Sequence, residues 1–355
     1  MTPTTVLVTG GAGFVGSTLA LHLKRYDVAR RVLALDNLKR RGSELNVPRL
    51  QAGGVEFVHG DIRCPEDLDV AATDLLLECS AEPSVLAGYD SSPEYLLNTN
   101  LGGTINLLEH CRRRGAAMIF LSTSRVYPMR ALAAIRLDET PTRFEIAGAQ
   151  TLAGISARGI SEEFPLSGAR SLYGATKLAS ELFIEEYAYA YGLRAVVDRC
   201  GVLAGPWQMG KVDQGFVALW VARHLFEGRL SYIGFGGSGK QVRDVLHVDD
   251  LCDLVTRQIA RLDDVAGQVF NVGGGRRVST SLCELTELCR RVTGKTIAID
   301  AVAATRTADV PLYVTDTAKV EATLGWSPTR DLERIVADTY DWMRAHAASL
   351  RAILA

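Results

Sequence analysis

Residues 6–16 read VLVTGGAGFVG, the most informative stretch of the chain. Its first three residues are apolar and predict a short buried strand, while the residues after Gly13 predict a helix. Between them, Gly10 permits a tight turn, Gly13 lets the backbone approach a pyrophosphate, and Gly16 lets helix and strand pack closely. The amide N–H groups at the start of such a helix face the phosphates of a dinucleotide. The residues expected to contact the dinucleotide here are Gly10, Gly13, Phe14, Val15 and Gly16.

The acidic residues that follow the next two predicted strands indicate which dinucleotide is bound. Asp36 ends the second predicted strand, 20 residues beyond Gly16, where an acid binds the adenosine ribose hydroxyls. Because a carboxylate repels a 2′-phosphate, Asp36 favours NAD over NADP. The basic run at residues 39–41 could instead accept that phosphate, which leaves NADP as the alternative. The pair Asp61-Ile62 follows the third predicted strand, and we expect it at the adenine ring.

Short apolar runs alternate with amphipathic helical stretches through the first half of the chain. This alternation predicts an α/β fold with a doubly wound parallel sheet and helices on both faces. After about residue 205 helical stretches dominate, which predicts a smaller, mixed α/β part. We therefore expect a dinucleotide-binding domain over 1–204, with an excursion at about 129–168, and a mainly substrate-binding domain over 205–355. The main predicted helices cover 93–114, 169–191, 213–228, 248–262, 279–293 and 331–355.

The composition argues against several classes of function. The 355 residues include 39 Lys and Arg and 41 Asp and Glu, and a net charge of −2 does not favour a nucleic-acid partner. The longest apolar run, residues 216–222, is too short for a membrane helix, which needs about 20 residues. Seven cysteines without a C-x-x-C pair, and histidines without metal-ligand spacing, favour a reduced cytoplasmic protein with no metal site.

The stretch LYGATK at residues 172–177 predicts a catalytic pair. Tyr173 and Lys177 lie four residues apart on a predicted helix, so both side chains share one face. The Lys177 ammonium and a nicotinamide ring nearby would favour the Tyr173 phenolate, which can exchange a proton with a substrate hydroxyl. Thr123 ends an earlier predicted strand, at the edge of a parallel sheet that faces the cofactor crevice. Its hydroxyl could bond the same substrate oxygen.

Taken together, these motifs resemble the extended short-chain dehydrogenase/reductases, in particular the NAD-dependent nucleotide-sugar epimerase/dehydratase family. The resemblance runs nearly the whole length of the chain. It implies a Rossmann-type domain, tightly held NAD and a nucleotide-sugar substrate. It also implies a homodimer formed through a four-helix bundle, to which each subunit gives the helices at 93–114 and 169–191. Further matching stretches are NLGGTINLLE (100–109), RCGV (199–202), GKQVRDVLHVDD (239–250), NVGG (271–274) and LGWSP (324–328).

The same resemblance assigns roles to individual residues. The catalytic residues it implies are Thr123, Tyr173 and Lys177. The cofactor contacts it adds to those above are Asn37, Ala81, Asn100, Ser122, Tyr173, Lys177, Cys200 and Val202. The substrate contacts it implies are Ser124, Arg125, Arg199, Gln208, Gln214, Arg243 and Arg306. Arg243 and Arg306 would bind the diphosphate, which suits the bidentate guanidinium.

Within the family, the long excursion after Thr123 and the stretch at 239–244 are most similar to the CDP-paratose 2-epimerases. That likeness implies oxidation at sugar C2 and re-reduction on the other face, with no net redox change. Where the 4,6-dehydratases carry a catalytic Asp and Glu, this chain has Ser124 and Arg125, and ECSAE at 78–82 departs from the family pattern. The alternatives are a 4-epimerase, a decarboxylase or an oxidoreductase on another nucleotide sugar, or a non-catalytic NAD-binding regulatory protein.

Overall fold

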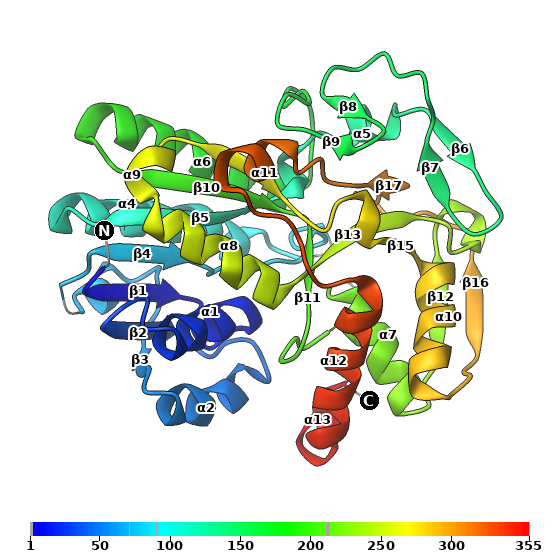
Figure 1. The fold of residues 1–355 in the computed structure, drawn as a ribbon, viewed down its shortest axis with the longest axis horizontal. Helices are drawn as coiled ribbons and strands as arrows, with labels where there is room; N and C mark the ends of the chain where they lie inside the picture. Colours follow the sequence, from blue (N-terminus) through cyan, green and yellow to red (C-terminus); the bar gives the residue numbers. More distant parts are fainter. Residues whose placement is uncertain (1–2, 71, 90, 211–213, 355) are drawn as a thin grey trace. The chain divides into compact units, whose positions relative to one another are not determined.

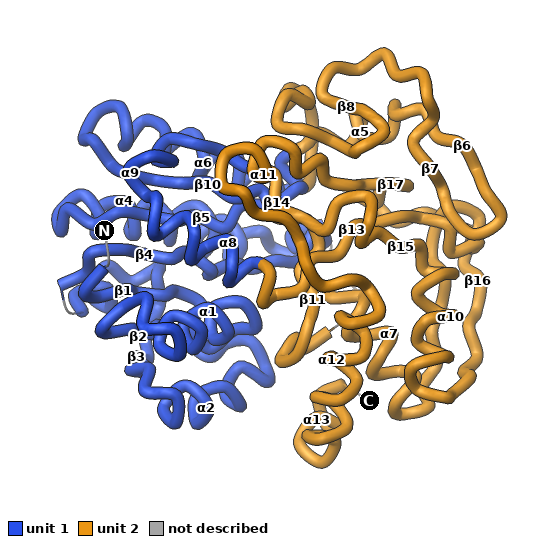
Figure 2. Tube along the Cα trace, viewed as in Figure 1, with its two compact units in different colours: residues 1–126, 172–199, 251–270 blue, residues 127–171, 200–250, 271–355 orange. Residues whose placement is uncertain are grey.

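The computed structural model describes residues 3–70, 72–89, 91–210 and 214–354. The chain forms two compact units that alternate along the sequence (Figure 2). Unit 1 comprises residues 1–126, 172–199 and 251–270, and unit 2 comprises residues 127–171, 200–250 and 271–355.

A seven-stranded sheet forms the centre of unit 1 (Figure 1), although the last residues of β10 and β14 belong to unit 2. The neighbouring pairs β5–β4, β4–β1, β1–β2 and β2–β3 are all parallel, which confirms the predicted α/β fold of Rossmann type. The strand β1 and its neighbour β4 are fully buried, as expected for a sheet covered on both faces. In order across the sheet, the strands are β14 (Val269–Val272), β10 (Ala195–Cys200), β5 (Ala117–Thr123), β4 (Leu75–Glu78), β1 (Thr5–Thr9), β2 (Arg31–Asp36) and β3 (Glu56–His59).

The helices of unit 1 cover this sheet with apolar side chains. Leu107 and Leu108 of α4 and Ile184 of α6 pack in one core cluster with strand residues such as Leu76 and Phe120. The helices α1 and α8 lie in front of the strands in Figure 1. The helices of this unit are α1 (Phe14–Arg25), α2 (Asn46–Ala52), α3 (Glu94–Leu97), α4 (Gly103–Arg114), α6 (Leu172–Tyr191), α8 (Val248–Ala260, with its first three residues in unit 2) and α9 (Leu262–Val265).

Unit 2 is a mixed α/β body with small sheets. β11 (Val202–Ala204), β13 (Val242–His247) and β15 (Ser279–Ser281) pair in that order, and β17 (Leu312–Tyr313) pairs with β13. β12 (Leu230–Ile233) pairs with β16 (Ile299–Val302). The helices α7, α10 and α12 pack against one another. The helices of unit 2 are α5 (Met129–Ala133), α7 (Phe216–Leu225), α10 (Leu282–Thr293), α11 (Ala318–Leu324), α12 (Leu332–Ala345) and α13 (Ala347–Leu354).

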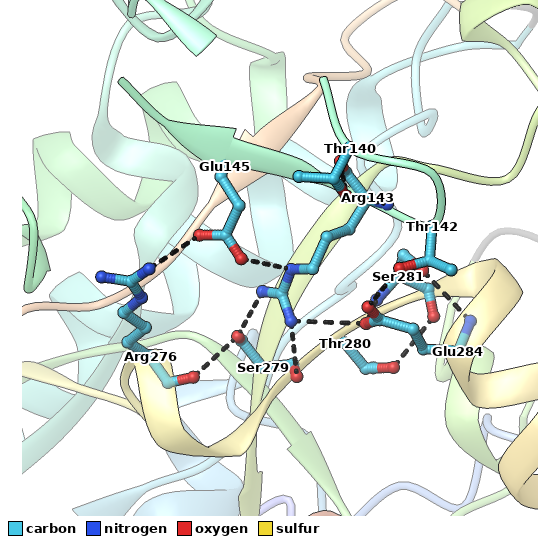
Figure 3. A network of polar contacts seen from close by, with 9 residues as sticks. All are labelled: Thr140, Thr142, Arg143, Glu145, Arg276, Ser279, Thr280, Ser281 and Glu284. Carbon is cyan, nitrogen blue, oxygen red and sulfur yellow. Dashed lines mark hydrogen bonds and ion pairs between the residues drawn. The ribbon is translucent and has the colours of Figure 1, made fainter. Parts of the chain in front are cut away.

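The excursion at 129–168 shows no clear periodicity in the sequence, yet it contains two small hairpins. They are β6 (Leu137–Glu139) with β7 (Phe144–Ile146), and β8 (Ile155–Ser156) with β9 (Gly159–Ile160). Arg143, in the turn of the first hairpin, joins it to the start of α10 (Figure 3). Its guanidinium donates to Ser279 Oγ at 2.6 Å and to Glu284 Oε2 at 3.3 Å. Glu284 also completes a capping box with Ser281, so one network anchors both the hairpin and the helix.

Two predicted helices are interrupted in the structure. The stretch at 93–114 divides into α3, a π-helical turn (Asn98–Gly102) and α4. Directly after this turn, Gly103 packs so closely on Ile62 that a Cβ added to Gly103 would lie 2.4 Å from the Ile62 side chain. The stretch at 331–355 forms α12 and α13, because His346 leaves the helical conformation and its Nδ1 lies 2.9 Å from the Trp342 carbonyl oxygen.

Candidate active site

The glycine turn of unit 1 forms a cradle that side chains would fill. Gly10 has a positive φ of 62°, and a Cβ there would lie 2.7 Å from the Cys79 carbonyl oxygen. A Cβ on Gly16 would lie 2.2 Å from the Gly10 carbonyl oxygen. The N-cap residue of α1 is Gly13, which has no side chain to cover the first amide N–H groups of the helix. The cradle therefore has room for a pyrophosphate, and the backbone at Phe14 and Val15 remains the predicted contact.

Asp36 holds this turn in place from the end of β2. Its Oδ2 accepts the Ala12 N–H at 3.0 Å, and its Oδ1 accepts the Leu38 N–H at 2.8 Å. Burial raises the pKa of Asp36, and these amide hydrogen bonds oppose the rise. The predicted ribose-binding acid is thus fixed in orientation beside the start of α1.

The residues predicted to bind the adenosine, Asn37 after β2 and Asp61 after β3, contact each other. Asn37 Nδ2 donates to Asp61 Oδ2 at 2.8 Å, and Arg63 binds the same carboxylate. The Arg63 hydrogen bond lowers the pKa of Asp61 to about 2, so this side chain is an anion at neutral pH. Ile62 is buried against α4. Lys39 of the basic run lies over the Tyr95 ring, 3.8 Å from its centroid.

Asn100, a predicted cofactor contact, bonds the protein backbone. Its Oδ1 accepts the Glu82 N–H at 2.8 Å, and its Nδ2 donates to the Glu82 carbonyl oxygen at 3.1 Å. The same Nδ2 lies 3.3 Å from Thr176 Oγ1 on α6. Asn100 therefore joins the end of the unusual segment 78–82, in which Ala81 is half-buried, to the helix α6.

The predicted catalytic residues belong to neighbouring elements of unit 1. The helix α6, with Tyr173 and Lys177, packs against β5, which ends at Thr123. Lys177 is buried, and its Nζ lies 3.9 Å from the centre of the Phe120 ring in β5. Thr123 Oγ1 accepts the Arg125 N–H at 3.2 Å, which leaves the Thr123 hydroxyl hydrogen available to a substrate oxygen. Ser124 and Arg125 are half-buried in the turn after β5.

A buried network that the sequence analysis missed lies behind these residues. Glu181 follows Lys177 by four residues on α6 and accepts a hydrogen bond from the Ser122 hydroxyl. Arg199 on β10 donates to the same carboxylate, with Nη2 2.7 Å from Oε2. Ser122 and Arg199, predicted at the cofactor and the substrate, thus both bind a protein carboxylate. The four-residue spacing of Tyr173, Lys177 and Glu181 was the available signal.

The other predicted substrate residues lie in unit 2. Arg243 Nη2 lies 2.8 Å from Asp309 Oδ1, and burial lowers the Arg243 pKa while Asp309 raises it. Gln208 Nε2 donates to the Leu203 carbonyl oxygen at 2.8 Å. Gln214 and Arg306 are half-buried, and these four residues remain predicted substrate contacts. Of the predicted cofactor contacts in this unit, Val202 is half-buried and Cys200 is buried.

Other kinds of site receive no support from the residues that the structure covers. No helix among them is long and apolar enough to cross a membrane. The same residues contain no group of three or more His, Cys, Asp or Glu side chains arranged to hold a metal ion.

The sheet carries a glycine cradle, an acid at the end of its second strand and a Tyr–Lys pair on a helix that packs against it. This combination defines a dinucleotide-dependent enzyme of the short-chain dehydrogenase type. The chain belongs to the NAD dependent epimerase/dehydratase family, whose model matches residues 6–273. The expected family is therefore confirmed, and with it an NAD-dependent enzyme of nucleotide-sugar chemistry.

Known proteins similar to this chain carry out several reactions. CDP-paratose 2-epimerase of Salmonella typhi is 32% identical over 347 residues, which cover 95% of this chain and 98% of that protein. dTDP-glucose 4,6-dehydratase of Streptomyces antibioticus is 31% identical over 351 residues, covering 97% and 93%. The structure of Thermus thermophilus UDP-glucose 4-epimerase in complex with NAD matches with a TM-score of 0.76 and 28% identity, covering 96% and 99%.

Proposed function

We propose that the protein is an NAD-dependent epimerase that inverts C2 of a CDP-sugar. The sugar hydroxyl is oxidised to a ketone, the ketone presents its other face, and re-reduction gives the epimer. No electrons are gained or lost overall. One observation carries the proposal: the Thr123, Tyr173 and Lys177 set is complete, while the two carboxylates of a 4,6-dehydratase are absent at Ser124 and Arg125. The likeness to CDP-paratose 2-epimerase supports C2 as the carbon and CDP as the nucleotide.

Three side chains move or hold the proton in this proposal. Tyr173 takes the proton of the C2 hydroxyl and returns it on re-reduction. Lys177, four residues further on α6, stabilises the Tyr173 phenolate through its charge and holds the nicotinamide ribose. The Thr123 hydroxyl donates to the reacting oxygen. Because α6 packs on β5, these groups can act on one substrate oxygen.

The cofactor is held by the backbone cradle and by Asp36. When bound there, NAD would supply the hydride acceptor for the oxidation and the hydride donor for the re-reduction. A Cβ at Gly16 would collide with the Gly10 carbonyl oxygen. Because Gly16 has no Cβ, the turn can keep the close conformation that accepts a pyrophosphate. Asp36, already oriented by two amide N–H groups, accepts the ribose hydroxyls and disfavours a 2′-phosphate.

Arg243 and Arg306 are proposed to bind the diphosphate of the substrate. Both are in unit 2, and Asp309 already orients the Arg243 guanidinium. Arg199 is different, because its guanidinium binds Glu181 through both Nε and Nη2. We therefore propose that Arg199 supports the substrate site by holding α6.

We also propose a cytoplasmic homodimer. Leu97 of α3 and Leu182 and Phe183 of α6 are 40%, 57% and 41% exposed, and α3 and α6 are in contact. Large apolar side chains on adjacent helices are typical of a subunit interface, and the family resemblance implies a second copy as the occupant. Within the described residues none of the seven cysteines forms a disulfide, which fits a reducing compartment.

The test is the product formed from defined substrates. The NAD-loaded protein is incubated with CDP-, UDP-, GDP- and dTDP-hexoses, and the products are identified by NMR and mass spectrometry. We expect a C2 epimer of a CDP-sugar, with unchanged mass and no accumulated NADH. Loss of a water molecule from the sugar would instead indicate dehydration, and inversion at C4 would move the chemistry to another carbon.

A further inference from the structure

Glu78 is a fully buried carboxyl group at the end of β4, next to the catalytic helix. Its neighbours across the sheet are Thr9 on β1 and Phe120 on β5. Phe120 is also the ring over which Lys177 Nζ lies. A buried carboxylate is costly unless it is paired or hydrogen-bonded. Neither the proposed chemistry of Tyr173 nor the proposed NAD site uses this residue.

The hydrogen bonds of Glu78 suit a carboxyl group that can gain and lose a proton. Its Oε1 lies 2.6 Å from Thr104 Oγ1, and that hydroxyl also lies 2.8 Å from the Asn100 carbonyl oxygen. Because a hydroxyl has one hydrogen, Thr104 can donate to only one of these oxygens at a time. A proton on Glu78 resolves the conflict, since Glu78 then donates to Thr104 and Thr104 donates to Asn100. Within the described residues, Glu78 Oε2 has no hydrogen-bond partner.

The charged group that acts on Glu78 is Lys177. Burial raises the pKa of Glu78 to about 7, and Lys177 and the Thr104 hydrogen bond oppose the rise. Two thiols also interact electrostatically with this carboxylate. Burial raises the pKa of Cys79 to about 12 and raises that of Cys111 further, so both thiols stay neutral at physiological pH. The interaction of Glu78 with a charged side chain is therefore the one with Lys177, which favours the ionised carboxylate.

We propose that Glu78 is a positioning residue that sets, through Lys177, how readily Tyr173 gives up its proton. Neutral Glu78 does not weaken the effect of the ammonium on the phenolate. Ionised Glu78 offsets part of the Lys177 charge and makes the phenolate harder to form. The inference rests on the proposed function only through the roles given to Tyr173 and Lys177.

The test is a direct titration of Tyr173 in the NAD-loaded protein without sugar. The protein is labelled at tyrosine Cζ with carbon-13, and the Tyr173 signal among 11 tyrosines is the one lost in Tyr173→Phe. Removing a negative charge makes a neighbouring acid easier to ionise. In Glu78→Gln we therefore expect the titration midpoint of Tyr173 to move to lower pH by about one pH unit.

Further variants separate this role from a structural one. Glu78→Asp keeps the carboxyl group, so its Tyr173 midpoint should lie closer to that of the natural protein than the midpoint of Glu78→Gln does. Thr104→Val keeps the carboxyl but removes its hydrogen bond, so Glu78 stays neutral to higher pH and the midpoint moves down by a smaller amount. Cys111→Ala, a buried and uncharged neighbour, should leave the midpoint unchanged.

An unchanged midpoint in folded Glu78→Gln would overturn the inference, as would an equal movement in Cys111→Ala. If Glu78→Gln does not fold, Thr104→Val decides, and an unchanged midpoint there overturns it. The titration uses no sugar. A protein inactive on every CDP-sugar would therefore refute the proposed function and leave this measurement valid.

Discussion

Arg199 Nη2 lies 2.7 Å from Glu181 Oε2, and both side chains are almost completely buried. The pair joins strand β10 to helix α6, which carries Tyr173 and Lys177. Glu181 also accepts a hydrogen bond from Ser122 on β5, so this one side chain links α6 to two strands of the sheet. The position of the predicted catalytic residues Tyr173 and Lys177 therefore depends on a buried contact further along the same helix.

The first prediction concerns the stability that this pair provides. Replacing Arg199 with Met leaves Glu181 buried without its countercharge, and breaking a buried pair in this way costs about 3–5 kcal/mol. Urea unfolding should show this loss in the free energy of unfolding. Arg31→Met is the matched control, because the Arg31–Glu56 pair is exposed and should contribute little. Equal stability of the two variants would contradict the account.

The second prediction uses Asp198, a buried acid on β10 whose pKa burial raises to about 7. Gln258 Nε2 donates to Asp198 Oδ1 at 2.7 Å, while Asp198 Oδ2 and Gln258 Oε1 have no partner within the described residues. A proton on Asp198 Oδ2 would let this oxygen donate a hydrogen bond to Gln258 Oε1. Asn at position 198 supplies the same hydrogen at every pH.

The sign of the effect follows from proton binding. The pKa of an unfolded Asp is ~4, so between pH 6 and pH 8 only the folded protein binds this proton. Stability from Asp198 is therefore present at pH 6 and falls by about 1 kcal/mol as the pH rises to 8. The free energy of unfolding, measured with urea at both pH values, should fall less between pH 6 and pH 8 in Asp198→Asn than in the natural protein. An equal fall in the variant and the natural protein would show that Asp198 is ionised throughout this range.

The third prediction concerns assembly. Leu182→Asp places a charge among the exposed apolar residues of α6 and should convert the proposed dimer to a monomer in analytical ultracentrifugation. Tyr26, beyond the end of α1, is also an exposed aromatic residue, and Tyr26→Asp should leave the dimer intact. A natural protein that sediments as a monomer would remove the proposal.

The fourth prediction separates an enzyme from an NAD-binding scaffold. Tyr173→Phe removes only the phenol oxygen, so NAD should still bind, while turnover should fall by at least 10²-fold. Tyr189→Phe is the control, because Tyr189 is on the same helix but 90% exposed. Turnover assays and NAD titration of both variants measure this. Full turnover in Tyr173→Phe would exclude the assigned role of Tyr173.

The glycine turn, the alternating strands and helices of the first half and the four-residue spacing of Tyr173 and Lys177 could be predicted, because each is a local pattern in the sequence. Glu181 could have been found in the same way, four residues beyond Lys177. Its partner Arg199 could not, since nothing in the sequence shows which strand residue meets that carboxylate. The hairpins of the excursion were also missed, because strands of two or three residues are too short to show a period.

The π-helical turn shows the same limit. The amphipathic pattern at 93–114 predicts one helix, but close packing of Gly103 on Ile62 and the Asn100 bonds to Glu82 depend on distant chain segments. Glu78 was visible in the sequence as a departure from the family pattern. Its burial and its interaction with the Lys177 charge could be seen only in the structure.

The most direct test of the central claim follows one hydrogen atom. A CDP-sugar carrying deuterium at C2 is converted by the NAD-loaded protein in ordinary water, and the product is examined by NMR and mass spectrometry. Oxidation and re-reduction at C2 predict an inverted C2 that keeps its deuterium, with a primary isotope effect when that bond breaks in the slow step. Inversion at C2 with loss of deuterium to the solvent, or inversion at C4 with C2 untouched, would contradict the account.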